Sequence, residues 1–237
     1  MVLGVVAMVG AGVGQAQNAS AIELILNGDF EAGTFASWTV TDLAGSSGSW
    51  FLDVPGSTIG GFSTLATPAN GAFYAVTSQG GPGTHALEQT FIVPGVFSSV
   101  ILTFDLFAND QSAGGLISNP AGLTHTAGPN QHARVDILSA GSSAFDTGAG
   151  VLFNVLAPFV DPNPDPNPFT SYAFDITGLV GGGGTFDLRF GQVDNQLFFN
   201  MGVDNVSISA VPEPSTILLL GSGLAGLVAW RIRKGRA

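Results

Sequence analysis

The sequence predicts an all-β fold, an antiparallel β-sandwich of the jelly-roll type. The 237 residues include 34 glycines and 13 prolines and only 10% charged residues, a composition that suits many turns between strands. Short apolar or alternating segments recur between clusters of Gly, Pro, Asn and Asp, and no segment of the body has a convincing helical period of 3.6 residues. The hydrophobic fraction of 45% is high enough to bury a core and argues against disorder.

Eleven strands are expected, because each of these segments is apolar or alternating and is bounded by turn residues. In chain order they span residues 22–26, 38–41, 49–54, 72–77, 86–93, 100–108, 133–138, 151–156, 171–176, 185–190 and 203–209. Alternation assigns faces within them. In 185–190, Phe186, Leu188 and Phe190 share one face, whereas Asp187 and Arg189 share the other.

The last expected strand carries a carboxylate among apolar residues. Alternation over 203–209 places Val203 on one face and Asp204, Val206 and Ile208 on the other, so Asp204 is expected on the apolar side near the start of the strand. An unpaired buried charge is costly, so this carboxylate needs a partner.

Charge is distributed unevenly along the chain. Of the six cations, Arg231, Arg233, Lys234 and Arg236 lie in the last seven residues. Residues 22–211 hold 16 carboxylates against two cations, a net charge of −14. Such a body repels phosphate backbones, which argues against nucleic-acid binding, and it suits a divalent cation. The chain has no cysteine, which excludes disulfides, thiolate nucleophiles and Cys-ligated metals.

The N-terminal end is typical of a secretion signal. Residues 2–14 form an apolar run of the right length, and Ala19-Ser20-Ala21 has the small-x-small pattern that signal peptidase accepts, so a signal peptide is expected over 1–21. A positively charged start is missing. Either the true start lies upstream, or the α-amino group is the only positive charge there. A buried helix or strand is the alternative, although the run has no clear period.

The C-terminal end predicts a transmembrane helix. Residues 215–230 contain no charge and would span about 24 Å as a helix, somewhat less than the hydrocarbon core of about 30 Å. Tilt, local thinning, and Trp230 with the flanking arginines at the interface can make up the difference. The basic tail is expected to stay cytoplasmic, and the acidic body to be translocated.

A specific motif precedes this helix. The sequence Val211-Pro212-Glu213-Pro214-Ser215, followed by the apolar run and by Arg231-Ile232-Arg233-Lys234, resembles the PEP-CTERM sorting signal of exopolysaccharide-producing Gram-negative bacteria. The resemblance implies processing by an exosortase, transient anchoring in the inner membrane and delivery to the cell surface or the extracellular space. It sets the sorting signal at 211–237 and the sandwich domain at 22–210. An ordinary membrane anchor is the alternative.

The body also carries short motifs. Asn27-Gly28-Asp29-Phe30-Glu31, followed by Trp38, and Gly202-Val203-Asp204-Asn205-Val206 resemble galactose-binding-like and carbohydrate-binding-module jelly rolls. That resemblance implies a structural calcium ion where the first and last strands meet, held by Glu31 and Asp204 with carbonyl oxygens near Gly28 and Asp29. Alternatively, Glu31 caps a turn and Asp204 accepts only local hydrogen bonds.

Catalysis finds little support in the sequence, and we expect no enzyme. His85, His125 and His132 are scattered, and none belongs to a recognisable catalytic motif. Trp50, beside the Gly48-Ser49 loop, is the aromatic residue that best suits sugar binding, whereas Trp38 is expected in the core.

These observations predict a secreted protein of the surface or matrix. The role expected for it is structural or adhesive and depends on calcium. A carbohydrate-binding module that recognises surface polysaccharide is the alternative.

Overall fold

The computed structural model describes residues 20–54, 58–59, 62–63, 71–78, 81–110, 116–118, 122–160, 167–196 and 199–213, together with 223, 226, 231, 234 and 235. The chain divides into two compact units. One is Ala21–Pro212, and the other combines Met1–Ser20 with Glu213–Ala237. The expected signal peptide at 1–21 lies almost wholly outside the described residues.

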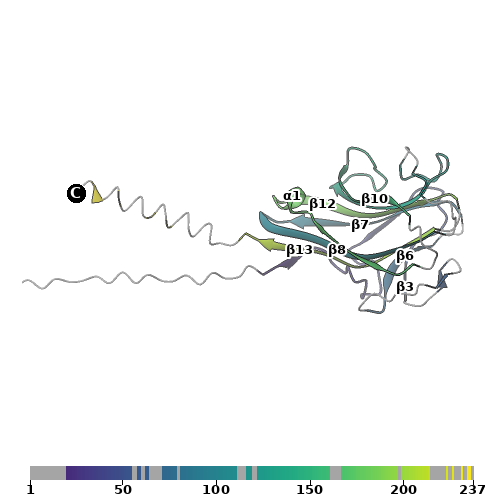
Figure 1. Cartoon of the computed structure of the whole chain (residues 1–237), viewed down its shortest axis with the longest axis horizontal. Helices are drawn as coiled ribbons and strands as arrows, with labels where there is room; N and C mark the ends of the chain where they lie inside the picture. The colour runs from purple at the N-terminus through teal and green to yellow at the C-terminus, as the bar shows by residue number, and fades with distance from the viewer. Residues whose placement is uncertain are drawn as a thin grey trace, which may run out of the picture. The chain divides into compact units, whose positions relative to one another are not determined.

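Ala21–Pro212 is an all-β sandwich of two antiparallel sheets, as predicted (Figure 1). The first sheet contains, from edge to edge, β11 (Thr170–Asp175), β8 (Phe97–Asp110), β13 (Phe199–Pro212), β6 (Tyr74–Ser78) and β3 (Ser49–Asp53), and β1 (Ile22–Glu23) also pairs with β13. The second sheet contains β10 (Val151–Phe159), β9 (Gln131–Ser139), β12 (Gly184–Asp194), β7 (Gly83–Val93) and β2 (Thr39–Asp42).

All eleven expected strands are present. Two small elements were not expected, a hairpin of β4 (Thr58–Ile59) with β5 (Phe62–Ser63) and the single-turn helix α1 (Thr177–Val180). From β6 to β13 the chain changes sheet at every step except between β9 and β10. Neighbours in each sheet are therefore mostly distant in sequence.

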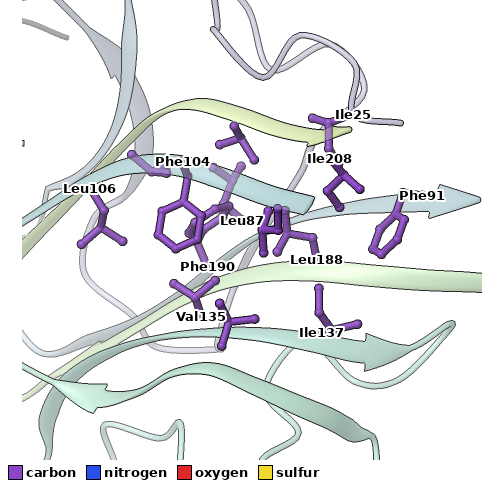
Figure 2. Packing of buried hydrophobic residues seen from close by; sticks show 14 of the residues in the cluster. Ile25, Leu87, Phe91, Phe104, Leu106, Val135, Ile137, Leu188, Phe190 and Ile208 are labelled. Carbon is purple, nitrogen blue, oxygen red and sulfur yellow. The ribbon is translucent and has the colours of Figure 1, made fainter. Parts of the chain in front are cut away.

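The core lies between the two sheets and is built from the inward-facing residues of both. Phe104 of β8 meets Phe190 of β12 edge to face, with ring centroids 5.4 Å apart. Figure 2 shows Phe104 and Leu106 directed toward Phe190 and Val135 of the opposite sheet. Leu188 and Phe190 are fully buried in this core, as alternation predicted. Aromatic and aliphatic packing between the layers thus fixes the platform on which the candidate sites lie.

Candidate functional site

A β-bulge interrupts β13 where it pairs with β8. The strands pair residue by residue up to Asp204 and Asp105, and the register has shifted where pairing resumes at Ser207. Asn205 has a φ of 50°, which accommodates the extra residue. Because of this bulge, Val203 and Val206 are both buried in the core. The predicted alternation is therefore wrong here, and Asp204, next to Val203, faces the other side of its sheet.

Asp204 is fully buried on that side, with 0% of its surface exposed. Its Oδ1 accepts a hydrogen bond of 2.7 Å from the Asn205 amide, whereas its buried Oδ2 has no hydrogen-bond partner among the described residues. Burial raises the pKa of Asp204 to about 8; the Asn205 amide opposes this, and the charges of Asp105, Glu31 and Asp29 add to it. The site therefore favours a proton or a cation on this carboxylate.

Glu31 lies on a loop that is fixed against the bulge. Its Oε1 accepts hydrogen bonds from the amides of Ala72 (2.7 Å) and Phe73 (2.9 Å). In the same loop, the Gly28 carbonyl accepts a bond of 2.8 Å from the Val206 amide. A Cβ on Gly28 would lie 1.8 Å from the Val206 carbonyl oxygen, so the close approach requires glycine. The fold thus brings Glu31 within electrostatic reach of Asp204.

The loop keeps its shape through one buried ring and one amide side chain. Phe30 is fully buried with a φ of 56°, and its ring centroid lies 5.5 Å from that of Trp38, which is in the core as expected. The Asn27 amide nitrogen donates to the carbonyls of Thr34 (2.9 Å) and Ala36 (3.1 Å). These contacts hold the carboxylates of the loop beside the last strand.

Asp204, Glu31, Asp29 and Asp105 form an acidic cluster at the bulge. The sequence analysis missed Asp105. It lies directly opposite Asp204 in the β8–β13 pair. Its Oδ2 accepts a hydrogen bond of 2.7 Å from Nδ2 of the Asn205 side chain. The Ser171 hydroxyl donates to its other oxygen. A signal was present, because Asp105 is the one charged residue in the otherwise apolar segment 100–108. Facing carboxylates repel each other unless a proton or cation lies between them.

The candidate metal ligands around the bulge are all oxygen atoms, which suits calcium more than a softer metal. A cavity of about 330 Å³ adjoins the bulge and is lined by Glu23, Ile25, Asn27, Gly28, Asp29, Asn205, Val206 and Ser207. Within the described residues, however, no three acidic or histidine side chains are grouped closely enough to hold a metal ion. A calcium ion here would need carbonyl and water oxygens in addition to the carboxylates, a mixture that Ca²⁺ accepts.

Trp50 lies in the core rather than on the surface. It is 4% exposed and pairs with Thr77 across β3 and β6. Its ring faces are therefore not available for stacking on a sugar in this structure, in contrast to the position expected for a ligand-binding aromatic.

An aromatic-lined cleft lies elsewhere, at the open side of the sandwich. It has a volume of about 170 Å³ and is lined by Leu106, Phe107, Ala108, Phe159, Val160, Thr170 and Tyr172. Its walls include β10 and β11, the edge strands of the two sheets. Tyr172 is half-buried and stacks on Phe104 with centroids 5.4 Å apart, and Thr170 is exposed at the rim.

Both cations of the acidic body lie in one buried network. Arg134 donates two bonds of 2.7 Å to Asp136, one to each carboxylate oxygen. Arg189 also donates to Asp136, and its Nη1 donates to the Asp146 carbonyl at 2.7 Å. Although burial alone would raise it, the bonds from Arg134 and the charge of Arg189 hold the pKa of Asp136 below its usual value. Both guanidinium groups are thus already engaged within the protein.

The three histidines lie in separate polar contacts. Each Nδ1 is within hydrogen-bonding distance of one side chain: His85 of Asp42 (2.6 Å), His125 of Thr84 (3.1 Å) and His132 of Asn130 (3.0 Å). Burial, and then the charge of Arg134, lower the pKa of His132 to about 4. The absence of catalysis stays a prediction.

β13 continues into the expected sorting segment. Its last residue, Pro212, pairs with Phe97 of β8. The Ser98 hydroxyl donates to the carbonyls of Val211 (3.1 Å) and Pro212 (3.4 Å). The start of the segment is therefore part of the sheet.

A comparison with known families decides what this segment is. The family model of the PEP-CTERM protein-sorting motif matches residues 210–234. The chain carries a PEP-CTERM sorting motif. The prediction from Pro212-Glu213-Pro214 and the basic tail is thereby confirmed, and the motif indicates an exported protein.

The PEP-CTERM tail is described only at single positions. Glu213 follows β13 directly, and Arg231 and Lys234 are helical, whereas Pro214 and Arg233 lie outside the described residues. Most of the expected transmembrane helix at 215–230 also lies outside them. Within the described part of the chain, no helix has the length and hydropathy needed to cross a bilayer.

Solved structures resemble the sandwich at low sequence identity. The K3 adhesin domain of Lys-gingipain from Porphyromonas gingivalis is 20% identical, with a TM-score of 0.48 over 80% of this chain and 98% of that one. The carbohydrate-binding module TmCBM61, solved with β-1,4-galactotriose, is 10% identical, with a TM-score of 0.46 over 79% of this chain and 97% of that one.

The enzymatically active domain of tailspike protein 4 from bacteriophage CBA120 is 14% identical, with a TM-score of 0.45 over 80% of this chain. This chain spans only 22% of the length of that structure. No curated protein matches the sequence. These likenesses carry no argument about function.

Glu88 of the second sheet has a raised pKa, which makes the stability of the fold depend on pH. It lies opposite Arg189 in the β7–β12 pair. Burial raises the pKa of Glu88 to about 7, Arg189 opposes this and Asp187 adds to it. Because the folded pKa is above the unfolded value of 4.5, the unfolded chain releases its proton first as the pH rises. This carboxyl therefore costs stability increasingly between about pH 4.5 and pH 7.

We expect Glu88→Gln to raise the free energy of unfolding by about 1 kcal/mol at pH 8 and to leave it nearly unchanged at pH 4.5. The gain at pH 8 is modest because Glu88 is partly exposed to solvent. Urea unfolding of the chain at both pH values measures this. Asp175→Asn is the control, because the Thr177 hydroxyl and amide lower the pKa of this exposed carboxyl below 3.8, so that its effect should vary little between pH 4.5 and pH 8. Equal effects of Glu88→Gln at both pH values would contradict the prediction.

Proposed function

We propose that this chain is an exported β-sandwich protein of an exopolysaccharide-producing bacterium that acts as a structural or adhesive component of the cell surface or matrix. The PEP-CTERM motif at 210–234 carries the proposal, because it begins within β13, the last strand of the sandwich. The cargo that an exosortase would deliver is then the sandwich itself. Residues 1–21 would direct export, and the apolar run 215–230 would hold the chain in the inner membrane until processing.

The strand order supports the jelly-roll assignment. In one sheet β6, β13, β8 and β11 are neighbours, and in the other β7, β12, β9 and β10. Eight strands arranged in this order form two Greek keys, the arrangement of a jelly roll. β2 and β3 extend the two sheets at one side.

Processing is tested by the intact mass of the protein recovered from the producing cells. We expect a C-terminus between Pro212 and Ser215, because the exosortase would remove the apolar run and the basic tail. Glu213→Ala, which alters the motif and leaves the apolar run unchanged, should leave most of the protein unprocessed. Recovery of the wild-type chain with Arg236 still attached would contradict the proposal.

Calcium is the second part of the proposal. We infer that the bulge binds Ca²⁺ through Asp204, with Glu31, Asp29 and Asp105 contributing charge or oxygen ligands. The buried, unpartnered Oδ2 of Asp204 supports this, and so does the rise in its pKa that the other three carboxylates reinforce. A divalent ion would hold Asp204 ionised and relieve the repulsion across β8 and β13.

We expect Ca²⁺ to raise the melting temperature of the full chain by about 5–10 °C at one hundred times its Kd, since binding at that excess adds about 2.7 kcal/mol. Asp204→Asn should abolish the shift and remain folded, because it replaces the buried charge with a neutral group of the same size. Asp175→Asn, a carboxylate outside the cluster, should retain the shift. A wild-type melting temperature that is the same in calcium and in chelator would contradict the site.

Sugar binding is the second candidate function, and the cleft between β10 and β11 favours it. Tyr172 and Phe159 offer apolar ring surface, and Thr170 offers a hydroxyl at the rim. A volume of about 170 Å³ is enough for one sugar ring and small beside most ligand pockets. The acidic body favours a neutral sugar over an acidic one.

If the cleft binds polysaccharide, Tyr172→Ala should weaken binding to the exopolysaccharide of the producing cells at least tenfold, since stacking on an aromatic ring provides much of such affinity. Phe153→Ala is the matched control and should bind normally, because Phe153 lies on β10 outside the cleft lining and is 42% exposed. Circular dichroism confirms that both variants are folded. Equal binding by both variants would exclude this cleft, and no binding by the wild type would favour the structural role.

A further inference from the structure

The PEP-CTERM tail leaves the sandwich without a linker. Pro212 is still paired with Phe97, and only Glu213 and Pro214 separate it from the apolar run that begins at Ser215. Three residue steps of extended chain span at most about 11 Å. When the run is inserted in a bilayer, as the proposed function requires, the end of β13 is therefore held within about 11 Å of the lipid surface.

Exposed apolar side chains gather at this end of the sandwich. We call them the exit-end patch, and they are Ile22 (38% exposed), Ile92 (60%), Val96 (59%) and Leu179 (37%). Figure 1 shows α1, the start of β8 and the end of β13 at the same end of the two sheets.

One hydrogen bond and the pairing of β1 place Val96, Leu179 and Ile22 of the patch around the exit of β13. The Phe97 amide, next to Val96, donates to the Gly181 carbonyl just after α1, which carries Leu179. Ile22 pairs with Ala210, on the other side of β13 from β8. The patch therefore surrounds the point at which the chain leaves the sandwich.

The charges near the patch favour an uncharged lipid surface. Asp175 is exposed and accepts a bond of 2.9 Å from the Thr177 amide, and Glu23 accepts bonds from the Ile25 and Ile208 amides at 2.8 Å. Both arginines of the body are engaged in the Asp136 network. No basic side chain of the sandwich is thus available for anionic headgroups, so the patch would bind lipid through apolar contact alone.

We propose that the exit-end patch rests on the lipid surface while the PEP-CTERM tail is inserted, and that it leaves the membrane when the tail is removed. A few partly exposed aliphatic side chains form a weak membrane contact on their own. The short tether makes this weak contact intramolecular and keeps it occupied. Removal of the tail ends that advantage, so the same patch does not retain the released protein.

Single-cysteine labelling tests this, because the chain contains no cysteine. An environment-sensitive fluorophore is attached to Val96→Cys in the patch, to Leu116→Cys and to Leu219→Cys in the apolar run. Leu116 is a matched control, since it is 49% exposed and adjoins Ile117, which bridges to Gln131 at the start of β9 and thus at the opposite end of the sandwich. The full chain is reconstituted in phosphatidylcholine vesicles whose acyl chains are brominated.

We expect bromine to quench the labels at 219 and 96 at least twofold more than the label at 116. Insertion of about ten Gly and Ser residues between Pro212 and Glu213, a flexible tether of roughly 18 Å, should at least halve the quenching at 96 and leave that at 219 unchanged. Equal quenching at 96 and 116 with strong quenching at 219 would overturn the patch and leave the proposed function intact. Absence of quenching at 219 would instead refute membrane insertion, and with it both proposals. Quenching at 96 that survives the longer tether would overturn the release step.

Discussion

The pairing of β13 with its neighbours in the first sheet is the contact on which the rest of the molecule depends. β13 lies between β8 and β6, and β1 pairs with it near its C-terminal end, at Ser209 and Ala210. Its inward residues, such as Val203 and Ile208, are part of the core, and its bulge positions Asp204. Its last residues begin the PEP-CTERM motif. A change in the register of this one strand would therefore alter the packing, the acidic cluster and the exit of the tail together.

The excess of carboxylates is the second constraint, and the two sheets accommodate it differently. The second sheet neutralises Asp136 with both arginines of the body in a buried network. The first sheet has no such partner for Asp204, which lies opposite Asp105 and near the carboxylates of the loop. Four of the carboxylates without a cationic partner, Asp29, Glu31, Asp105 and Asp204, thus lie beside the bulge. Buried carboxylates of this kind favour a proton or a cation, and calcium, the ion proposed for the bulge, has the matching preference for oxygen ligands.

The strands could be predicted from sequence because alternation and turn residues are local signals. The bulge could not, because one residue in a left-handed conformation reverses the faces on either side of it, and Asn205 only permits that conformation without requiring it. Trp50 was misplaced for a related reason, since its Gly-Ser neighbours suggest a loop whereas β3 packs it into the core. The partners of Arg189 come from β9 and the following loop, and a contact between such distant segments leaves no local pattern.

The position of β13 also sets the order of events during export. Without β13, the first sheet would consist of two separate parts, β3 with β6 and β8 with β11, because no other strand in the described part of the chain joins them. On the proposed route, β13 can pair along its whole length only after residue 212 has crossed the membrane, when the apolar run is next to enter it. On the proposed route, the sandwich therefore completes its folding at the membrane, already tethered by its tail. Non-local strand pairing is slow, and tethering during this step keeps an incompletely paired sheet from meeting other chains.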